Sequence, residues 1–270
     1  MAELNGKVAI VTGAGRLRSI GKATAIALAR LGADVVVTGT GRNPETFPID
    51  EKNMGWKDIE STAELIRVEG RRAMPIVVDV VNPKDVQMLM DRTLQEFGRV
   101  DILINNAAFA RGEDRVPIVD LSLGIFQKVM DVKVTGTYLC SKSFVKVLLD
   151  QGNGGKIVNV SSAAGKRGAA NALAYNAANF ALVGMTQSMA HELGPNGINV
   201  NCVCPGAVDT ARLDDLGRGD RWKEMAVDTP IGRNGTPEEV GEFIVYLCTE
   251  AASWIHGQSI NLNGGVVMEH

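Results

Sequence analysis

The sequence has few cysteines, few histidines and no long apolar run, and each shortage excludes a class of protein. Its four cysteines form no CxxC pair and no spacing typical of metal ligands, so we expect reduced core thiols in a cytoplasmic protein. Three scattered histidines favour no metal site. No apolar stretch approaches the ~20 residues that a membrane span needs, and the charged N-terminus differs from a signal peptide.

Charge of one sign is also scarce. The formal net charge is −3 with the two signs interspersed, which gives no reason to expect nucleic acid or a membrane surface as a partner. The chain has 270 residues, of which 45% are hydrophobic. That is enough apolar material for one large core, so we expect a single domain over residues 1–270.

Short β-branched runs alternate with segments of helical period. The runs predict strands at 7–13, 34–39, 74–80, 100–106, 156–162, 197–203 and 258–263. One helix signal starts at Asn82 and Pro83 and stops at Gly98, and a similar one covers 236–248. The alternation predicts βαβ units in a mostly parallel, doubly wound sheet, which binds ligands beyond the carboxyl ends of its strands.

The first predicted strand runs into the glycine-rich stretch TGAGRLRSIG. A turn of this kind lets backbone amides and a helix N-terminus hold a pyrophosphate. Gly13 and Gly15 are followed by Gly21, so the strict GxGxxG spacing is absent and the motif by itself is weak. Its place at the first crossover of a doubly wound chain favours a nucleotide.

The end of the second predicted strand indicates which nicotinamide cofactor is preferred. Enzymes that use NAD commonly place an acidic residue there, whereas this strand ends at Gly39. Arg42 follows closely, and Arg16 and Arg18 lie in the glycine-rich turn. Guanidinium groups can grip a 2′-phosphate through two hydrogen bonds. The three arginines favour NADP(H), although each could also be an ordinary solvated loop residue.

Several motifs together resemble the short-chain dehydrogenase/reductase family. They are TGAGRLRSIG, NNAA at 105–108, IVNVSS with Tyr175 thirteen residues after Ser162, CPGAVDT at 204–210, and the final GQSINLNGG. The resemblance covers essentially the whole chain. It implies a Rossmann-type sheet of about seven parallel strands with helices on both faces, and a ketoreductase acting on a small carbonyl or alcohol. It also implies a homotetramer or homodimer.

The resemblance also assigns individual residues. Gly13, Ser19, Ile20 and Gly21 match a phosphate turn that is here two residues longer, and Arg18 matches a basic residue of NADPH-preferring members. Further cofactor positions are matched by Asp79, Val80, Asn106, Pro205, Gly206, Val208 and Thr210. Ser162 matches the serine that orients the substrate oxygen, and Tyr175 matches the acid/base.

One departure from the family concerns the charge beside the tyrosine. A free phenol titrates near ~10, so proton transfer near neutral pH benefits from a nearby cation. Family members carry a lysine four residues after the tyrosine, where this chain has Asn179, and an asparagine where this chain has Lys133. We hypothesise an exchange in which Lys133 supplies the ammonium and Asn179 keeps a hydrogen bond to the ribose. A weakened, altered or inactive site is the alternative.

Two further segments differ in what they predict. Residues 209–232 match the family's substrate lid, whose Arg212, Arg218 and Arg221 either grip an anionic substrate or are solvated charges paired with nearby aspartates. Arginines in 109–117 and 165–171 are expected near the mouth of the same cleft. The segment 40–56 is longer than usual and predicts an ordered loop, either over the adenosine end or at a subunit contact.

Three other functions remain as alternatives on the same fold. An enoyl-thioester reductase would carry a lysine seven residues after its tyrosine, where this chain has Leu182. A non-catalytic NADP(H) sensor would bind the cofactor without turnover. A cofactor-free lyase or dehalogenase would usually lose the glycine-rich turn, which this chain retains.

Overall fold

The computed structural model describes residues 3–217 and 219–269, except for the side chain of Arg221. Seven strands form one sheet in the order β3-β2-β1-β4-β5-β6-β7, and every neighbouring pair is parallel. The predicted doubly wound sheet is therefore confirmed, and each strand lies where its β-branched run predicted it. The strands are β1 Val8–Val11, β2 Asp34–Gly39, β3 Ala73–Val77, β4 Ile102–Asn105, β5 Gly155–Val160, β6 Ile198–Pro205 and β7 Ser259–Leu262.

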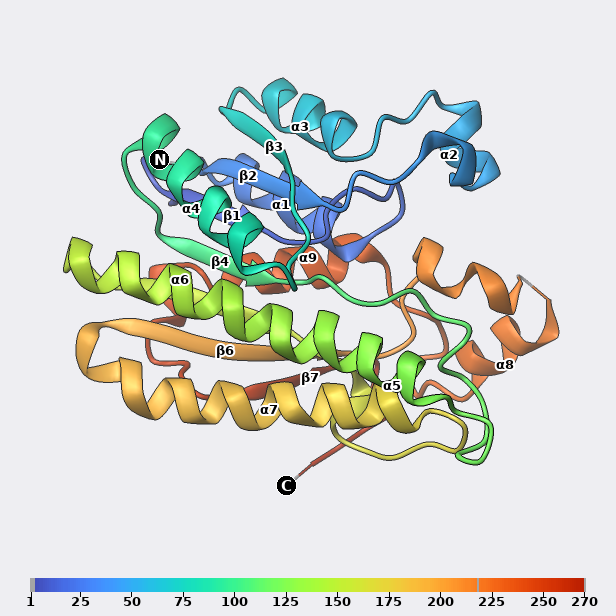
Figure 1. Cartoon of the computed structure of the whole chain (residues 1–270). Helices are drawn as coiled ribbons and strands as arrows, with labels where there is room; N and C mark the ends of the chain where they lie inside the picture. The colour runs from blue at the N-terminus through green and yellow to red at the C-terminus, as the bar shows by residue number, and fades with distance from the viewer. Residues whose placement is uncertain (1–2, 218, 270) are drawn as a thin grey trace.

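Helices connect the strands and cover both faces of the sheet (Figure 1). The α-helices are α1 Ile20–Arg30, α2 Ile49–Asn53, α3 Ile59–Val68, α4 Pro83–Phe97, α5 Leu123–Met130, α6 Gly136–Gln151, α7 Leu173–Leu193, α8 Asp220–Val227 and α9 Pro237–Tyr246. Short helical turns are η1 Pro44–Thr46, η2 Asp131–Thr135, η3 Ala163–Gly165, η4 Gly194–Asn196, η5 Ala211–Leu216 and η6 Glu250–Ala252. Among the described residues, no helix is long and apolar enough to cross a membrane.

Two apolar clusters fill the space between the sheet and its helices. One joins the sheet to α1, α3 and α9, and the other joins it to α4, α6 and α7. Figure 1 shows α4, α6 and α7 in front of the strands and α1 and α9 behind them. Because each face is covered, the four residues of β1 are all buried, which explains their continuous apolar run.

The helix ends that the sequence predicts for α4 and α9 are observed in the structure. The side chain of Asn82 accepts from the backbone N–H of Lys84 at the start of α4. Gly98 ends the helix in the left-handed region, with φ +74°. At α9, Thr236 and Glu239 form a reciprocal capping box.

The chain reverses its direction of travel across the sheet between β1 and β4. β2 and β3 lie on one side of β1, whereas β4 to β7 follow on the other. The loops after β1 and β4 therefore diverge and leave a crevice at the carboxyl edge of the sheet. Figure 1 shows α2, α5 and α8 gathered at one end of the molecule.

The four cysteines, Cys140, Cys202, Cys204 and Cys248, are free and buried, in agreement with the expectation of core thiols. Burial raises the pKa of Cys140 and of Cys248 to about 12. These two thiols therefore stay protonated at neutral pH.

The contact between α1 and α9 depends on Gly241. A Cβ at this position would lie 2.8 Å from the backbone nitrogen of Thr24 and 2.9 Å from the carbonyl carbon of Ala23. We expect Gly241→Ala to lower the free energy of unfolding by about 1–3 kcal/mol through overpacking. The control is Gly184→Ala in α7, where a Cβ meets nothing within 4 Å. This variant should raise the free energy of unfolding by about 0.5–1 kcal/mol. Urea unfolding measures both, and equal effects would contradict the close contact.

Candidate functional site

The turn after β1 is held against the loop after β4. Gly13 has φ +69°, and a Cβ there would lie 2.9 Å from the Cα of Ala107. The Nδ2 of Asn106 donates to the carbonyls of Thr12 and Gly13, both at 2.9 Å. The amide of Asn106 is thus occupied in joining the two loops. The turn ends at Ser19, whose hydroxyl caps α1 by accepting from the N–H of Lys22.

Two cavities lie at the carboxyl edge of the sheet. The first, here called the turn cavity, has a volume of about 510 Å³ and adjoins the glycine-rich turn. The second, the tyrosine cavity, has a volume of about 380 Å³. They adjoin each other, since they share the lining residues Ile20, Asn106, Ala108, Arg111, Thr210 and Arg212.

The cavities bring together most of the residues singled out in the sequence. The turn cavity is lined by Gly13, Arg16, Arg18, Ser19, Ile20, Arg42, Asp79, Val80, Asn106 and Thr210. The tyrosine cavity is lined by Lys133, Ser162, Tyr175, Pro205, Gly206, Val208 and Thr210, among others. Two predicted residues line neither cavity: Gly21, whose Cβ would meet the carbonyl of Gly13 at 2.7 Å, and Asn179.

Lys133 lines the tyrosine cavity from the π-helical turn η2, which connects α5 directly to α6. Such π-helical turns are frequent at functional sites. The Nζ of Lys133 is buried and donates to the carbonyl of Val160 at 2.5 Å. Burial, with the nearby Arg212 guanidinium adding to it, lowers the pKa of Lys133 to about 7.

The side chain of Asn179 faces the protein interior. It is fully buried, its Nδ2 donates to the carbonyl of Tyr175 at 2.8 Å, and the hydroxyl of Ser161 lies 3.0 Å from the backbone carbonyl of Asn179 and 3.3 Å from its Oδ1. The predicted hydrogen bond from Asn179 to a ribose is therefore not supported by this arrangement. The physical reason is that both ends of the amide already have partners behind the cavity wall.

Two arginines lie over the ring of Tyr175. The Cζ of Arg115 is 4.1 Å from the ring centroid, and the Cζ of Arg212 is 5.1 Å from it. Arg115 comes from the loop after β4. The sequence predicted only that the arginines of residues 109–117 lie near the mouth of the cleft. The sequence alone did not pair it with Tyr175, which is remote from it along the chain.

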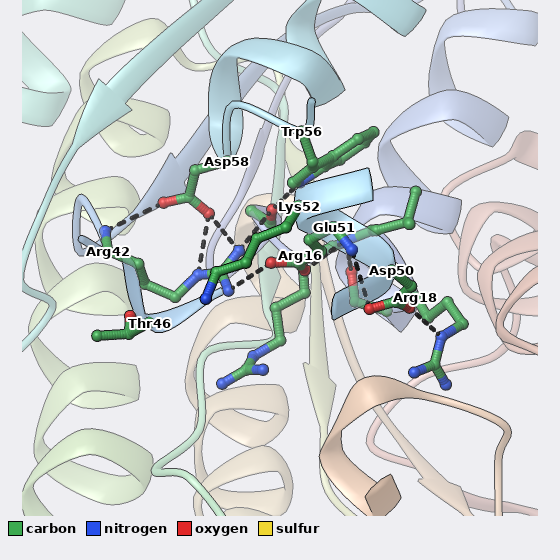
Figure 2. Close-up of polar contacts among 12 residues, drawn as sticks. Arg16, Arg18, Arg42, Thr46, Asp50, Glu51, Lys52, Trp56 and Asp58 are labelled. Atoms are coloured by element: carbon green, nitrogen blue, oxygen red, sulfur yellow. Dashed lines mark hydrogen bonds and ion pairs between the residues drawn. The ribbon is translucent and has the colours of Figure 1, made fainter. Parts of the chain in front are cut away.

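Arg42 is held by two carboxylates (Figure 2). Its Nη1 lies 2.8 Å from Glu51, and its Nη2 lies 2.9 Å from Asp58. Burial opposes the charge of Arg42, but the hydrogen bonds to Glu51 and Asp58 outweigh it and raise the pKa. The Asp58 carboxylate also faces Gly15, where a Cβ would meet its Oδ1 at 1.9 Å.

The segment 40–56 lies against the glycine-rich turn. The Nε1 of Trp56 donates to the carbonyl of Gly15 at 2.6 Å, and the N–H of Leu17 donates to Glu51 at 2.9 Å (Figure 2). Arg42 donates to the same Gly15 carbonyl at 3.1 Å. The segment is thus an ordered part of the wall behind the glycine-rich turn, a position that agrees with the expected loop over the adenosine end.

The other two arginines of the turn have different surroundings. Arg18 lies 2.8 Å from Asp50 and 2.6 Å from Asp214, and the hydrogen bond to Asp214 is the largest cause of its raised pKa. Arg16 has no carboxylate within ion-pair distance in the described part of the chain, and Figure 2 shows it extending away from the acids that hold its neighbours. Burial lowers the pKa of Arg16, with Arg42 adding to the effect.

The expected lid contains η5 and α8. Arg212 donates to the carbonyl of Phe109. Asp214 pairs with Arg18, and Asp215 pairs with Arg111, so these lid acids reach across to other loops. Arg218 lies outside the described residues, as does the side chain of Arg221.

The comparisons with known proteins agree with this geometry. A family model described as enoyl-(acyl carrier protein) reductase matches residues 13–267. A 3-oxoacyl-[acyl-carrier-protein] reductase of Synechocystis sp. is 36% identical over 269 residues, which cover 99% of this chain and 100% of that one. The chain belongs to the short-chain dehydrogenase/reductase family.

Further members of this short-chain dehydrogenase/reductase family resemble the chain over nearly its whole length. A cis-4-hydroxycyclohexanecarboxylate dehydrogenase of Sinomonas cyclohexanicum is 37% identical and covers 96% of both chains. A crystal structure of a short-chain type dehydrogenase/reductase from Mycobacterium marinum has a TM-score of 0.87 at 31% identity, with 99% of this chain and 98% of that one covered. A structure with bound NADP, of an Agrobacterium tumefaciens protein described as a 2-deoxy-d-gluconate 3-dehydrogenase, has a TM-score of 0.83 at 31% identity and covers 98% of each.

The two cavities of this short-chain dehydrogenase/reductase fit the nicotinamide cofactors that the family uses. Gly13 and Gly15 line the turn cavity without side chains, so backbone borders the cavity there, as a pyrophosphate cradle requires. The two adjoining cavities together extend from that turn to Tyr175, an arrangement that suits one extended dinucleotide.

The buried Lys133 makes stability depend on pH. Its pKa is about 7 in the folded chain and near ~10.4 in the unfolded chain, so between these values the folded state binds fewer protons and wild-type stability rises with pH. We expect Lys133→Met, relative to wild type, to be most stable below about pH 7 and to lose that advantage toward about pH 10. Urea unfolding across this range measures it, with the exposed Lys128→Met as control. A stability difference that does not change with pH would contradict the buried charge.

Proposed function

We propose that the protein is an NADP(H)-dependent oxidoreductase that interconverts a carbonyl and a secondary alcohol by hydride transfer. One observation carries the proposal. Tyr175, Ser162 and Lys133 line a single cavity that adjoins the cavity of the glycine-rich turn. A proton donor, a hydroxyl donor and a cation therefore meet beside the expected position of the nicotinamide.

The bound nicotinamide supplies or accepts the hydride. In the reducing direction, Tyr175 would give its proton to the carbonyl oxygen, while the bound cofactor would supply the hydride for the carbonyl carbon. Ser162 donates a hydrogen bond to the same oxygen, which holds the carbonyl in place and stabilises developing negative charge. Tyr175 regains its proton from solvent after the alcohol has formed.

Lys133 takes the part of the family's usual lysine in this proposal. Its pKa of about 7 means that a substantial fraction of the side chain is protonated near neutral pH. An ammonium in the tyrosine cavity favours the phenolate form by Coulomb attraction, whichever helix supplies it. Asn179 supports the site from behind, through its hydrogen bond with the hydroxyl of Ser161 beside Ser162.

The NADP(H) preference rests mainly on Arg16. Arg18 and Arg42 have carboxylates close to them, so much of their charge is already balanced. Arg16 lines the turn cavity without an ion-pair partner among the described residues. A 2′-phosphate would supply the missing anion.

Arg16→Ala tests the cofactor preference. We expect wild type to bind NADPH more tightly than NADH, and the variant to lose on the order of tenfold in NADPH affinity with little change for NADH. Energy transfer from the three tryptophans to the reduced cofactors measures both constants. Arg30→Ala, on the exposed side of α1, is the control. Tighter binding of NADH by wild type would overturn the preference.

Lys133→Ala tests the exchange of lysine and asparagine. Without the ammonium, phenolate formation keeps the support of Arg115 and Arg212 but loses that of Lys133, so the rate of alcohol oxidation should rise at higher pH than in wild type. A pH–rate profile for each protein, with Lys128→Ala as control, measures the displacement. An unchanged profile would show that Lys133 does not assist Tyr175.

The second candidate is a non-catalytic NADP(H) sensor, which the absence of the usual lysine at position 179 keeps in view. It predicts tight cofactor binding without turnover on any panel of carbonyls. An enoyl-thioester reductase is less well supported, because Leu182 is fully buried in the core at the place where a lysine is expected. A cofactor-free lyase or dehalogenase does not explain why the glycine-rich turn is retained and held by so many contacts.

A further inference from the structure

The lining of the tyrosine cavity is strongly unbalanced in charge. Its described cationic residues are Arg111, Arg115, Lys133, Arg167 and Arg212, whereas Asp228 is the one acidic residue that lines it. Such a lining attracts anions, and the surrounding apolar walls strengthen the attraction by excluding water. Leu213, Met225 and Val266 supply that apolar surface.

Some of this positive charge is compensated from outside the cavity, and some is not. Arg111 pairs with Asp215, and Arg115 pairs with the buried Asp114. The described hydrogen-bond partner of Arg212 is the carbonyl of Phe109, which carries no formal charge. Arg212 therefore keeps its charge unbalanced within the described residues.

The charge of Arg212 affects the pKa values of two neighbouring cations. Burial lowers the pKa of Lys133 and of Arg115, and the charge of Arg212 lowers both further. Three cations that disfavour one another line one cavity, and a bound anion would relieve that repulsion. Solvated surface charges behave differently, because water and salt screen the repulsion between them.

The position of Arg115 and Arg212 indicates where the anion lies. Both guanidinium groups lie over the ring of Tyr175, at 4.1 and 5.1 Å from its centroid. A planar guanidinium binds a carboxylate through two parallel hydrogen bonds. An anionic group held there lies close to the phenol, at a distance that one small molecule carrying both an anionic group and the reacting carbonyl can span.

We infer that the substrate is a compact oxo or hydroxy carboxylic acid whose carboxylate is bound by Arg115 and Arg212. This inference rests on the proposed oxidoreductase function and adds the class of its substrate. The carboxylate takes no part in the redox step and serves to orient the carbonyl toward Ser162 and Tyr175. Leu213 and Met225 face the apolar body of the molecule.

Calorimetric titration of the NADPH-saturated protein tests the inference without requiring turnover. The probes are matched pairs, each a carboxylate and its carboxamide: benzoate and benzamide, cyclohexanecarboxylate and cyclohexanecarboxamide, octanoate and octanamide. We expect at least one carboxylate to bind on the order of tenfold or more tightly than its amide. The absence of a carboxylate preference in every pair would overturn the inference.

The variants Arg212→Gln and Arg115→Gln then locate the preference. Each should lose it while binding the amides as before, whereas the remote Arg30→Gln should retain it. Arg115→Gln leaves the buried Asp114 without its partner, so Arg212→Gln, whose lost contact is to a backbone carbonyl, carries the test if the first variant fails to fold. Arg212→Lys keeps the charge and should retain part of the preference. A preference that survives Arg212→Gln would overturn the assignment.

Turnover separates this inference from the proposed function. NADPH oxidation with 4-oxocyclohexanecarboxylate and with its methyl ester is compared. Equal rates for acid and ester would overturn the carboxylate site while the oxidoreductase function stands. Preferential binding of carboxylates without turnover of any carbonyl would support the anion site while the oxidoreductase proposal fails. Arg212 also lines the turn cavity, so NADPH affinity is measured for Arg212→Gln to separate cofactor binding from substrate binding.

Discussion

The parallel pairing of β1 with β4 determines where the rest of the site lies. At this place the loops after the two strands part, and the amide of Asn106 ties their bases together by donating to the carbonyls of Thr12 and Gly13. The crevice above this tie is where both cavities open. Each later strand, being parallel, ends at the same edge, so Ser162 after β5 and Gly206 after β6 are delivered to the wall of the same crevice. A single antiparallel strand in this part of the sheet would have sent its loop to the opposite end.

Charge is treated differently at the two ends of the crevice. Near the glycine-rich turn, Glu51 and Asp58 hold Arg42, and Asp50 and Asp214 hold Arg18, so that cations and carboxylates position one another. These pairs are partly buried and act mainly as scaffolding for the turn. Around Tyr175 the balance is reversed, since Arg115, Arg212 and Lys133 outnumber the acids that line the cavity. The turn end is thus held together by its own ion pairs, whereas the described lining of the tyrosine end has more cations than acids.

Lys133 and Asn179 have different surroundings in the site. The side chain of Lys133 lies at the end of β5, where the carbonyl of Val160 accepts from its Nζ. The amide of Asn179 lies in the interior, where its Nδ2 donates to the carbonyl of Tyr175 and its Oδ1 lies 3.3 Å from the hydroxyl of Ser161. The cation at position 133 therefore lines the tyrosine cavity, whereas the amide at position 179 lies behind the cavity wall.

The sequence by itself determined the features that depend on local period and local backbone chemistry. Continuous apolar runs marked the buried parallel strands, Asn82 and Gly98 marked the limits of α4, and the glycine-rich turn marked the crevice. The distance between Tyr175 and Asn179 along one helix was enough to raise the question of the missing lysine. Tertiary structure decided what each side chain faces. Asp58 contacts Arg42 from the start of α3, and Arg115 contacts Tyr175 from the loop after β4. The side chain of Asn179 faces inward, toward Ser161. These contacts join segments that are remote along the chain. They depend on how the loops pack at one edge of the sheet, and the hydrophobic period of the sequence does not predict that packing.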